Sequence, residues 1–311
     1  MSGAAVTEAQ VLVVGGGIGG LAVAAALARG GKRVRVLAKA SEIREIGAGI
    51  QIAPNGSRAL DRLGVLAEIH ASAVFPRTIA WLDAVSGEPL TSLALGDAFR
   101  ARYGYPYFVM HRSDLLAALL AACRADERIA LETERDVTAL EDHGSFVQAA
   151  CADGTAYRCE VLVGADGLRS VVRQHVVGDG EPVCSEYVAY RGTLPVAQLR
   201  HDADLDGVLL WTGPGMHLVQ YPVRRGELYN QVAVFKSDRY APGARDWGSP
   251  EELDARFGRG CPAVRAAAQL IARDRRWPMY DRLPVERWTR NRVVLIGDAA
   301  HPMLQYLAQG A

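Results

Sequence analysis

The amino-acid sequence predicts an α/β protein, in which a Rossmann-like dinucleotide-binding domain carries an inserted, mainly antiparallel β-sheet domain covered by helices. Three observations predict this fold. Residues 10–37 show the order strand, glycine turn, helix and strand, which is the βαβ unit of a parallel sheet. Two more short apolar strands, at residues 161–164 and 292–296, end in turns that contain an aspartate. Between them, residues 187–235 alternate like strands, with frequent glycine and proline turns.

The first βαβ unit can be assigned residue by residue. An apolar run at residues 10–14 and an alternation of Arg with Val or Leu at residues 33–37 predict its two strands. The alanine-rich helix at residues 21–29 stops at Gly30-Gly31. Residues 11–28 carry no charge, but their five glycines favour a strand, a turn and a buried helix over a membrane span.

The later elements follow in chain order. We predict helices at residues 57–66, 113–125 and 253–273, the second with Ser113 as its N-cap. Strands are expected at residues 128–140 and 145–151, followed by a turn at Asp153-Gly154.

Composition and charge exclude several classes of function. The chain has 311 residues, enough for about two domains, and its 50% hydrophobic and 23% charged residues are typical of globular proteins. It has 35 basic and 35 acidic residues, so it lacks the basic surface that nucleic acids or anionic membranes attract. Its cysteines are odd in number and form no CxxC pair, which predicts a cytoplasmic protein without a disulfide framework or a metal site.

Residues 15–20 fit the dinucleotide-binding pattern G-x-G-x-x-G. Gly15 permits the tight turn, Gly17 lets the backbone approach a pyrophosphate, and Gly20 lets the helix pack closely on the strand. The N-terminus of the following helix favours an anion. The alternative is an ordinary glycine turn before a helix, but the surrounding βαβ unit favours dinucleotide binding.

The pattern also requires an acidic residue after the second strand, where it binds the ribose hydroxyls. Ala38 stands at this position and Lys39 follows it. Glu42 and Glu45 lie close behind, but neither is at the expected place. We therefore expect weaker cofactor binding, by about 1–3 kcal/mol, the scale of a lost hydrogen bond to a charged group.

Two aspartates follow the later apolar strands. Asp166 lies in the sequence Gly-Ala-Asp-Gly-Leu-Arg-Ser of residues 164–170, with Arg173 just beyond it. Asp298 follows the strand at residues 292–296 and is placed to bind a ligand hydroxyl. Taken singly, the first pattern is typical of a turn and the second of a helix N-cap.

Together, the glycine motif, the central Asp-Gly motif and the C-terminal Gly-Asp motif resemble those of the flavoprotein aromatic hydroxylases, over essentially the whole chain. The resemblance implies a bound FAD, and NADH or NADPH as a transient reductant without a Rossmann domain of its own. It implies that Asp298 binds the FAD ribitol and that Arg112 lies near the pyrophosphate. Asp166 and Arg173 match the motif linked to both FAD and the pyridine nucleotide, and Val137 matches a backbone contact to adenine.

A narrower resemblance follows the Gly-Asp motif. Residues 301–311 read His-Pro-Met-Leu-Gln-Tyr-Leu-Ala-Gln-Gly-Ala, with Gln305 where most of the family has proline. This is similar to the 3-hydroxybenzoate 6-hydroxylase subgroup, which also carries a His and a Tyr four residues apart on a strand. His217 and Tyr221 match that spacing and would share one strand face. The alternative for His217 alone is a satisfied core histidine.

The resemblance implies an FAD-dependent monooxygenase that converts a phenolic aromatic acid, 3-hydroxybenzoate, into gentisate with NAD(P)H and O2, through a flavin 4a-hydroperoxide. His217, with a pKa near neutrality, would accept the phenol proton. Gln305 would bind the same oxygen and Tyr221 the substrate carboxylate. Alternatives are a salicylate-hydroxylase-like enzyme with another aromatic substrate and a catalytically silent FAD-fold binding protein. A homodimer is possible under any of these interpretations.

The same resemblance predicts the domain boundaries. We expect an FAD-binding domain from residues 1–75, 105–180 and 288–311, and a substrate domain from residues 76–104 and 181–287. The chain ends at Ala311, where the family's flavin-contacting helix begins. We therefore expect a truncated protein with lowered flavin content.

Overall fold

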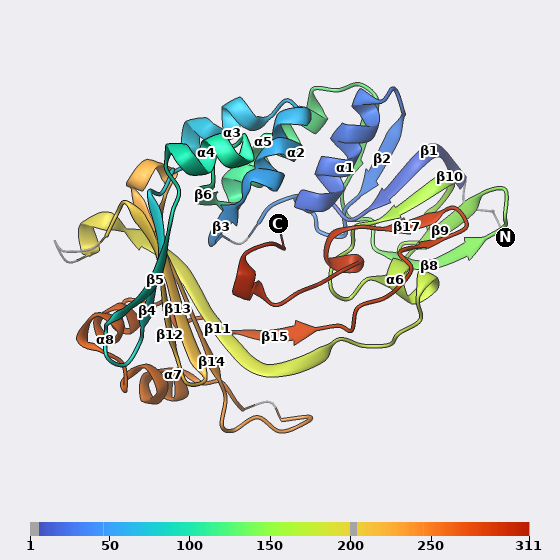
Figure 1. Cartoon of the computed structure of the whole chain (residues 1–311). Helices are drawn as coiled ribbons and strands as arrows, with labels where there is room; N and C mark the ends of the chain where they lie inside the picture. Colours follow the sequence, from blue (N-terminus) through green and yellow to red (C-terminus); the bar gives the residue numbers. More distant parts are fainter. Residues whose placement is uncertain (1–5, 46, 200–203, 245, 311) are drawn as a thin grey trace.

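Two large β-sheets and one small sheet organise the chain in the computed structural model, which describes residues 6–45, 47–199, 204–244 and 246–310 (Figure 1). The first large sheet has eight strands, mostly parallel, and the second has seven, mostly antiparallel. The predicted fold class is thereby confirmed.

The first sheet has the strand order β16-β17-β10-β1-β2-β7, and β8 and β9 extend it from β10. The bounds are β1 (Val6–Val14), β2 (Val34–Leu37), β7 (Ile129–Glu132), β8 (Val137–Asp142), β9 (Val147–Cys151), β10 (Ala156–Gly164), β16 (Thr289–Arg290) and β17 (Val293–Leu295). In the parallel pairs, Val14 lies beside Gly164 and Gly164 beside Leu295. The three motif-bearing turns therefore leave the sheet at one edge, side by side.

Alternation along β1 explains how this sheet is covered on both faces. Val11 and Val13 point into a core that contains Leu21 of α1 (Ile18–Arg29) and Leu119 of α5 (Arg112–Arg124). Leu12 and Val14 point the other way, into a core shared with β9, β17 and α6 (Val171–Val176). The remaining helices on the first side are α2 (Pro54–Arg62) and α3 (Leu66–Ser72).

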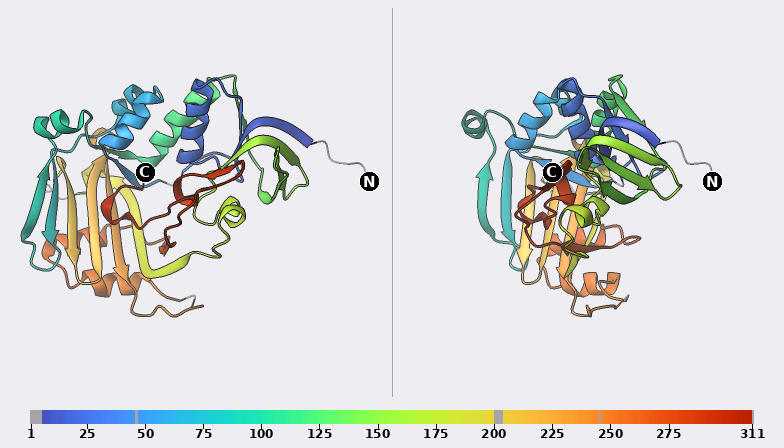
Figure 2. Two further views of the ribbon diagram at one scale, coloured as in Figure 1. Left: turned by 45° about the vertical axis from the view of Figure 1, so that its right-hand side comes forward. Right: turned by 90° about the vertical axis from the view of Figure 1, so that its right-hand side faces the viewer.

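The second sheet has the order β15-β11-β14-β13-β12-β4-β5, and only β12 and β4 pair in parallel. The bounds are β4 (Thr78–Asp83), β5 (Pro89–Ala94), β11 (Val183–Pro195), β12 (Gly207–Gly213), β13 (Met216–Val223), β14 (Leu228–Lys236) and β15 (Trp277–Asp281). Helices α7 (Pro250–Phe257) and α8 (Pro262–Gln269) cover one face, where Tyr190, Leu218 and Phe235 pack with Phe257. The other face turns toward the first sheet (Figures 1 and 2).

The small sheet connects the two large ones. It pairs β3 (Gly49–Ile52) with β6 (Phe108–His111), and α4 (Asp97–Tyr103) precedes β6. Figure 2 shows the C-terminal segment 297–310 between the two large sheets. Within the described ranges, no helix has the length and apolarity needed to cross a bilayer.

Three sequence predictions of elements are wrong. The strand expected at residues 128–140 is two strands, β7 and β8, separated by a turn in which Glu134 has a positive φ of 57°. The helix expected at residues 253–273 is divided into α7 and α8, because Gly258, Gly260 and Pro262 interrupt it. Helix α5 begins at Arg112, so His111 takes the N-cap position instead of Ser113.

Elements within residues 78–103 and 183–281 belong to the second sheet or lie beside it, and the flanking segments build the first sheet and the small sheet. Residues 1–5, 46, 200–203, 245 and 311 of the expected domains lie outside the described residues.

Candidate active site

The glycine turn between β1 and α1 has the geometry of a pyrophosphate cradle. Gly15 has a φ of +115°, and a Cβ at this position would collide with the carbonyl oxygen of Ala165. A Cβ at Gly20 would collide with the carbonyl oxygen of Gly15, so helix and strand approach each other at these two glycines. At Gly17, by contrast, no atom lies within 4 Å of an added Cβ. The turn is therefore open on the side where a pyrophosphate would meet the N-terminus of α1.

The end of β2 offers no acid to a ribose. Ala38 is buried, and a Cβ built on Gly16 would lie 2.9 Å from the Ala38 Cβ, so the methyl group faces the glycine turn. The nearby Glu132 carboxylate is held by Arg35, Arg135 and the Tyr157 hydroxyl.

The other charged groups that follow β2 are also paired. Lys39 Nζ lies 2.9 Å from the Asp136 carboxylate on the surface, and Glu42 lies 3.6 Å from Arg44. Among the described residues that follow β2, neither Lys39 nor Glu42 is therefore an unpaired replacement for the acid missing at position 38.

The region expected to meet adenine lies beside the end of β2. The Arg135 N–H donates to the Ala38 carbonyl oxygen at 3.0 Å. Val137 follows two residues later as the first residue of β8, and its side chain is buried in the core below the sheet. A contact between Val137 and a ligand would therefore have to use its backbone.

Asp166 and Arg173 hold protein segments together. The Ser170 hydroxyl donates to Asp166 at 2.5 Å and the Val172 N–H at 3.2 Å, while burial raises the pKa of the Asp166 carboxyl. Arg173 is fully buried, and it donates to the carbonyl oxygens of Ala299 and Ala300 at 3.0 and 2.7 Å. The Asp-Gly and Gly-Asp turns are therefore fastened to each other.

Asp298 lies in a concave part of this edge. Its side chain is accessible, yet desolvation by the surrounding protein raises the pKa of its carboxyl, and the charges of Arg112 and His301 only partly oppose that rise. Arg112, the first residue of α5, donates to Glu45 at 3.1 Å, and its buried Nε has no hydrogen-bond partner in the described part of the chain. An open pyrophosphate turn, an accessible carboxylate and an unpartnered guanidinium N–H are donors and acceptors that fit FAD.

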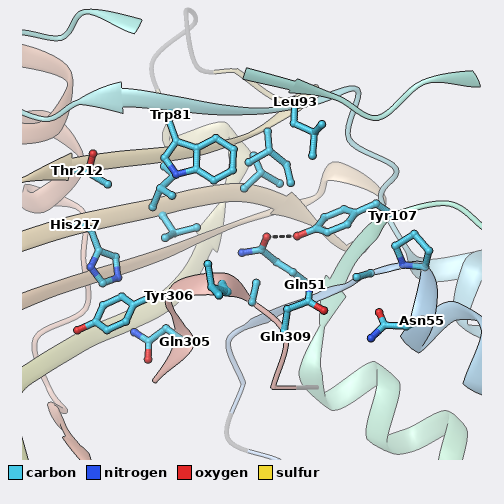
Figure 3. A pocket seen from close by; sticks show the side chains of 18 of the residues that line it. Gln51, Asn55, Trp81, Leu93, Tyr107, Thr212, His217, Gln305, Tyr306 and Gln309 are labelled. Atoms are coloured by element: carbon cyan, nitrogen blue, oxygen red, sulfur yellow. Dashed lines mark hydrogen bonds between the residues drawn. The ribbon is translucent and has the colours of Figure 1, made fainter. Parts of the chain in front are cut away.

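A cavity of about 800 Å³ lies on the inner face of the second sheet (Figure 3). The C-terminal segment 305–309 forms one wall of it, and β3 and α2 close another. The Tyr107 hydroxyl hydrogen-bonds to Gln51 at that side, as Figure 3 shows. The residues that line the cavity and are labelled in Figure 3 are Gln51, Asn55, Trp81, Leu93, Tyr107, Thr212, His217, Gln305, Tyr306 and Gln309.

His217 and Gln305 line the same wall of this cavity (Figure 3). The His217 ring is 8% exposed and lies edge-on to Tyr306, with 5.3 Å between ring centroids. Burial lowers the pKa of His217 to about 4, so the expected value near neutrality is wrong for the ligand-free site. The Gln305 amide donates to the Met279 sulfur at 3.7 Å.

Tyr221 lies on the same strand face but deeper than the cavity lining. It is 3% exposed and belongs to a buried cluster with Tyr107 and Val109. Its ring covers Gly49, where an added Cβ would lie 2.6 Å from the Tyr221 hydroxyl oxygen. Burial raises the pKa of that hydroxyl. Gln305 and His217 are thus brought together, and Tyr221 lies behind them.

Sequence reasoning missed most of the polar lining residues, among them Gln51, Tyr107 and Tyr306. Gln51 and Tyr107 lie on or beside the short strands β3 and β6, which were not predicted, and Tyr306 directly follows Gln305. The alternation in Gly49-Ile50-Gln51-Ile52 was the available signal for β3.

Comparison with known proteins identifies the family. A model described as "FAD binding domain" matches residues 8–311. The chain is 42% identical, over 303 residues, to a 3-hydroxybenzoate 6-hydroxylase of Klebsiella oxytoca, covering 97% of this chain and 76% of the relative. It is 38% identical, over 304 residues, to a 3-amino-4-hydroxybenzoate 2-monooxygenase of Streptomyces cremeus, covering 98% and 75%.

A solved structure agrees with the same fold. The crystal structure of Klebsiella pneumoniae HpxO with FAD and uric acid superposes with a TM-score of 0.83 at 26% identity, over 97% of this chain and 76% of that one. The cofactor turn, the fold and these relatives agree on one conclusion. The chain belongs to the FAD-binding domain family and, within it, to the flavoprotein aromatic hydroxylases, which are FAD-dependent monooxygenases.

Proposed function

We propose that this protein hydroxylates a phenolic aromatic acid, with 3-hydroxybenzoate as substrate and gentisate as product, using O2 and NADH or NADPH. The observation that carries the proposal is the pairing of His217 with Gln305 on one wall of a cavity in an FAD-binding fold. Identity of 42% to a 3-hydroxybenzoate 6-hydroxylase supports the choice of ring acid.

In this proposal FAD is held along the shared edge of the first sheet. Gly15, Gly17 and Gly20 let the pyrophosphate approach the N-terminus of α1. Arg112 donates from the start of α5, and Asp298 accepts the ribitol hydroxyls. The backbone at Val137 meets the adenine, while Asp166 and Arg173 keep the turns in place. Residues 1–75, 105–180 and 288–311 are the proposed FAD-binding domain, and residues 76–104 with 181–287 the proposed substrate domain.

When bound, FAD supplies the reduced flavin that activates O2 and delivers one oxygen atom to the ring. The protein must deprotonate the phenol, orient the ring and exclude water. His217 is neutral at pH 7 because burial keeps its pKa at about 4, so it is free to accept the phenol proton. The phenolate formed beside it then stabilises the imidazolium. Gln305 binds the same oxygen, and the carbon para to it is carbon 6 of 3-hydroxybenzoate.

The role proposed for Tyr221 is to donate to the substrate carboxylate. Its buried hydroxyl lies against Gly49, where an added Cβ would come within 2.6 Å of the hydroxyl oxygen. A carboxylate that reaches past Gln51 would meet this donor. The same phenol chemistry suits other hydroxybenzoates, so a salicylate-hydroxylase-like specificity is the alternative that the test must include.

The test follows the oxidation of NADH and of NADPH with a panel of ring acids: 3-hydroxybenzoate, salicylate and 3-amino-4-hydroxybenzoate. Products are identified by chromatography. We expect gentisate from 3-hydroxybenzoate with one product formed per nicotinamide oxidised. No hydroxylated product from any acid, in protein that is yellow with bound flavin, would favour the catalytically silent alternative.

Variants then test the proposed roles. His217→Ala and Gln305→Ala should slow hydroxylation by about 10²–10⁴-fold, the usual loss of a general base, and release hydrogen peroxide instead. Asn55→Ala is the matched control, because Asn55 lines the opposite end of the same cavity (Figure 3). Unchanged coupling in both His217→Ala and Gln305→Ala would remove these residues from the reaction.

The cellular location is also a proposal. The five cysteines are all free thiols in the structure, four of them buried. Buried thiols of this kind are typical of a reducing compartment. We therefore propose a cytoplasmic enzyme.

A further inference from the structure

Arg191 is a cation on the inner face of the second sheet. It lies in β11, two residues after Ala189, which packs with Met279 of β15 and Leu304 of the C-terminal segment. Residues two apart on a strand share a face. Arg191 therefore points away from α7 and α8 and toward the first sheet, where the cofactor motifs lie.

The Arg191 guanidinium has no carboxylate partner among the described residues. Its Nε is buried without a hydrogen-bond partner, and its Cζ stacks 4.6 Å from the centre of the Trp277 ring. The fully buried Arg173, by contrast, is paired with Asp179, and the buried Arg282 shares that carboxylate. Arg191 as a whole is only partly buried, but its Nε is shielded from solvent and has no acceptor among the described residues, so the position of Arg191 indicates that a bound group supplies one.

The neighbouring charges place that group on the cofactor side. Burial and the charges of Arg112 and Arg275 lower the pKa of Arg191, and Glu45 and Tyr221 raise it. The same Arg112 and Glu45 act on Asp298, the residue assigned to the ribitol. Arg191 is not part of the cavity lining that contains His217 and Gln305. The glycine turn that would hold the pyrophosphate belongs to the first sheet. The ribitol joins the pyrophosphate to the flavin ring, so the flavin ring is the part of FAD that extends toward the second sheet.

We propose that Arg191 faces the flavin ring of bound FAD and stabilises its reduced, anionic form. The oxidised ring is neutral, whereas uptake of two electrons and one proton from NAD(P)H leaves the ring negatively charged. A fixed cation in a desolvated site favours the anion over the neutral ring. Arg191 therefore raises the reduction potential of the flavin, which drives electron transfer from the nicotinamide. This role is independent of which ring acid is hydroxylated.

Arg191→Met removes the charge and keeps the length of the side chain. Three quantities are measured on the full chain: the dissociation constant of oxidised FAD, the midpoint potential of the bound flavin, and the Tm of the FAD-free protein. We expect the ratio of the affinities for reduced and oxidised flavin to be about tenfold lower in the Met variant than in the wild type. For a two-electron couple, this corresponds to a midpoint potential that is lower by about 30 mV. Arg191→Lys should restore most of the potential.

Arg275→Met is the matched control. Arg275 stacks on the same Trp277 ring, with its Cζ 5.2 Å from the ring centre, but its side chain is exposed. Loss of this stacking and of a solvent-screened charge should change the flavin potential much less than Arg191→Met does. A purely structural Arg191 would lower Tm in the Met variant without moving the potential, and that result overturns the proposal. The proposal is also overturned if the potential is unchanged and only the affinity for 3-hydroxybenzoate falls, because the anion that pairs with Arg191 would then be the substrate carboxylate.

The wild-type protein gives an answer that does not depend on any variant folding. If the reduced flavin stays anionic, the potential falls by about 30 mV per pH unit between pH 5.5 and 6.5, since one proton accompanies two electrons. A slope of about 60 mV per pH unit means that a second proton is taken up, so the ring is neutral. The steeper slope would refute a flavin-facing cation at position 191.

Discussion

Lowering the pH should destabilise the folded protein through His217. The imidazole is 8% exposed on the cavity wall, and burial lowers its pKa from the ordinary 6.5 to about 4. Between these two values the unfolded chain binds a proton that the folded chain does not bind. The free energy of unfolding therefore falls as the pH drops below 6.5, and the contribution of His217 levels off below about pH 4.

The size of this effect follows from the same two values. One pKa unit corresponds to 1.36 kcal/mol, so lowering the pKa from 6.5 to about 4 is worth about 3 kcal/mol at full protonation. A loss of this size is a large part of the 5–15 kcal/mol that stabilises typical domains, roughly a fifth to three-fifths of it. His217→Gln keeps a polar side chain of similar size and has no proton to bind, so it should remove this part of the pH dependence.

The assay is urea unfolding at a series of pH values from 7 to 4, without substrate and with the same FAD loading in each protein. The quantity of interest is the wild-type curve minus the His217→Gln curve, because burial also lowers the pKa of His70 and His175 and both histidines remain in the variant. His143→Gln is the control, since this ring is exposed on the surface. If His217→Gln keeps the full wild-type loss of stability, burial does not lower the pKa of His217 in the folded protein, and the pH dependence has another source.

Three further predictions concern the cofactor turn and the back of the cavity. Ala38→Glu restores the missing ribose acceptor and should tighten FAD by about tenfold or more, the effect of one hydrogen bond to a charged group; equal or weaker affinity in a titration of FAD-free protein would contradict this. Gly49→Ala places a Cβ 2.8 Å from the Asn230 Cγ and against the Tyr221 ring, so unfolding in urea should show about 1–3 kcal/mol of overpacking. An unchanged midpoint would mean that β3 can move away from the sheet. Tyr221→Phe should raise the KM for the ring acid with kcat and coupling nearly unchanged, as expected for uniform binding, and a large fall in kcat alone would argue against a carboxylate contact.

The cofactor side of the fold could be predicted because its signals are local. Gly15 and Gly20 are each required by a backbone contact within the same βαβ unit or at the neighbouring strand end, and Gly17 leaves the turn between them open. The turns at Asp166 and Asp298 then meet that unit because β10 lies between β1 and β17 in one parallel sheet. A short apolar strand followed by a turn with several glycines or a Gly-Asp or Asp-Gly pair is enough to indicate each of these three turns.

The substrate side could be predicted only in part, because its geometry depends on contacts across long sequence distances. The period of the strand correctly put His217 and Tyr221 on one face, but it could not show that Gly49 from a distant short sheet covers Tyr221. The Asn230 side chain accepts the Gly49 N–H at 2.6 Å, a contact across 181 residues that fixes this covering. Burial of the His217 ring, and with it the lowered pKa, depends on the same docking and on Tyr306.

This contrast has a consequence for how specificity varies among related proteins. FAD is bound by backbone turns at adjacent strand ends, and HpxO keeps the same fold with FAD at 26% identity. The cavity is built from side chains of several separate segments, among them β3 with α2, the strands β4, β12 and β13, and residues 305–309. Substitutions there can change which ring fits without moving the glycine turn. We therefore expect exchange of cavity residues such as Gln51 or Gln305 to alter the choice of ring acid while FAD affinity stays the same, and a parallel loss of FAD would show that the two sites are not separable.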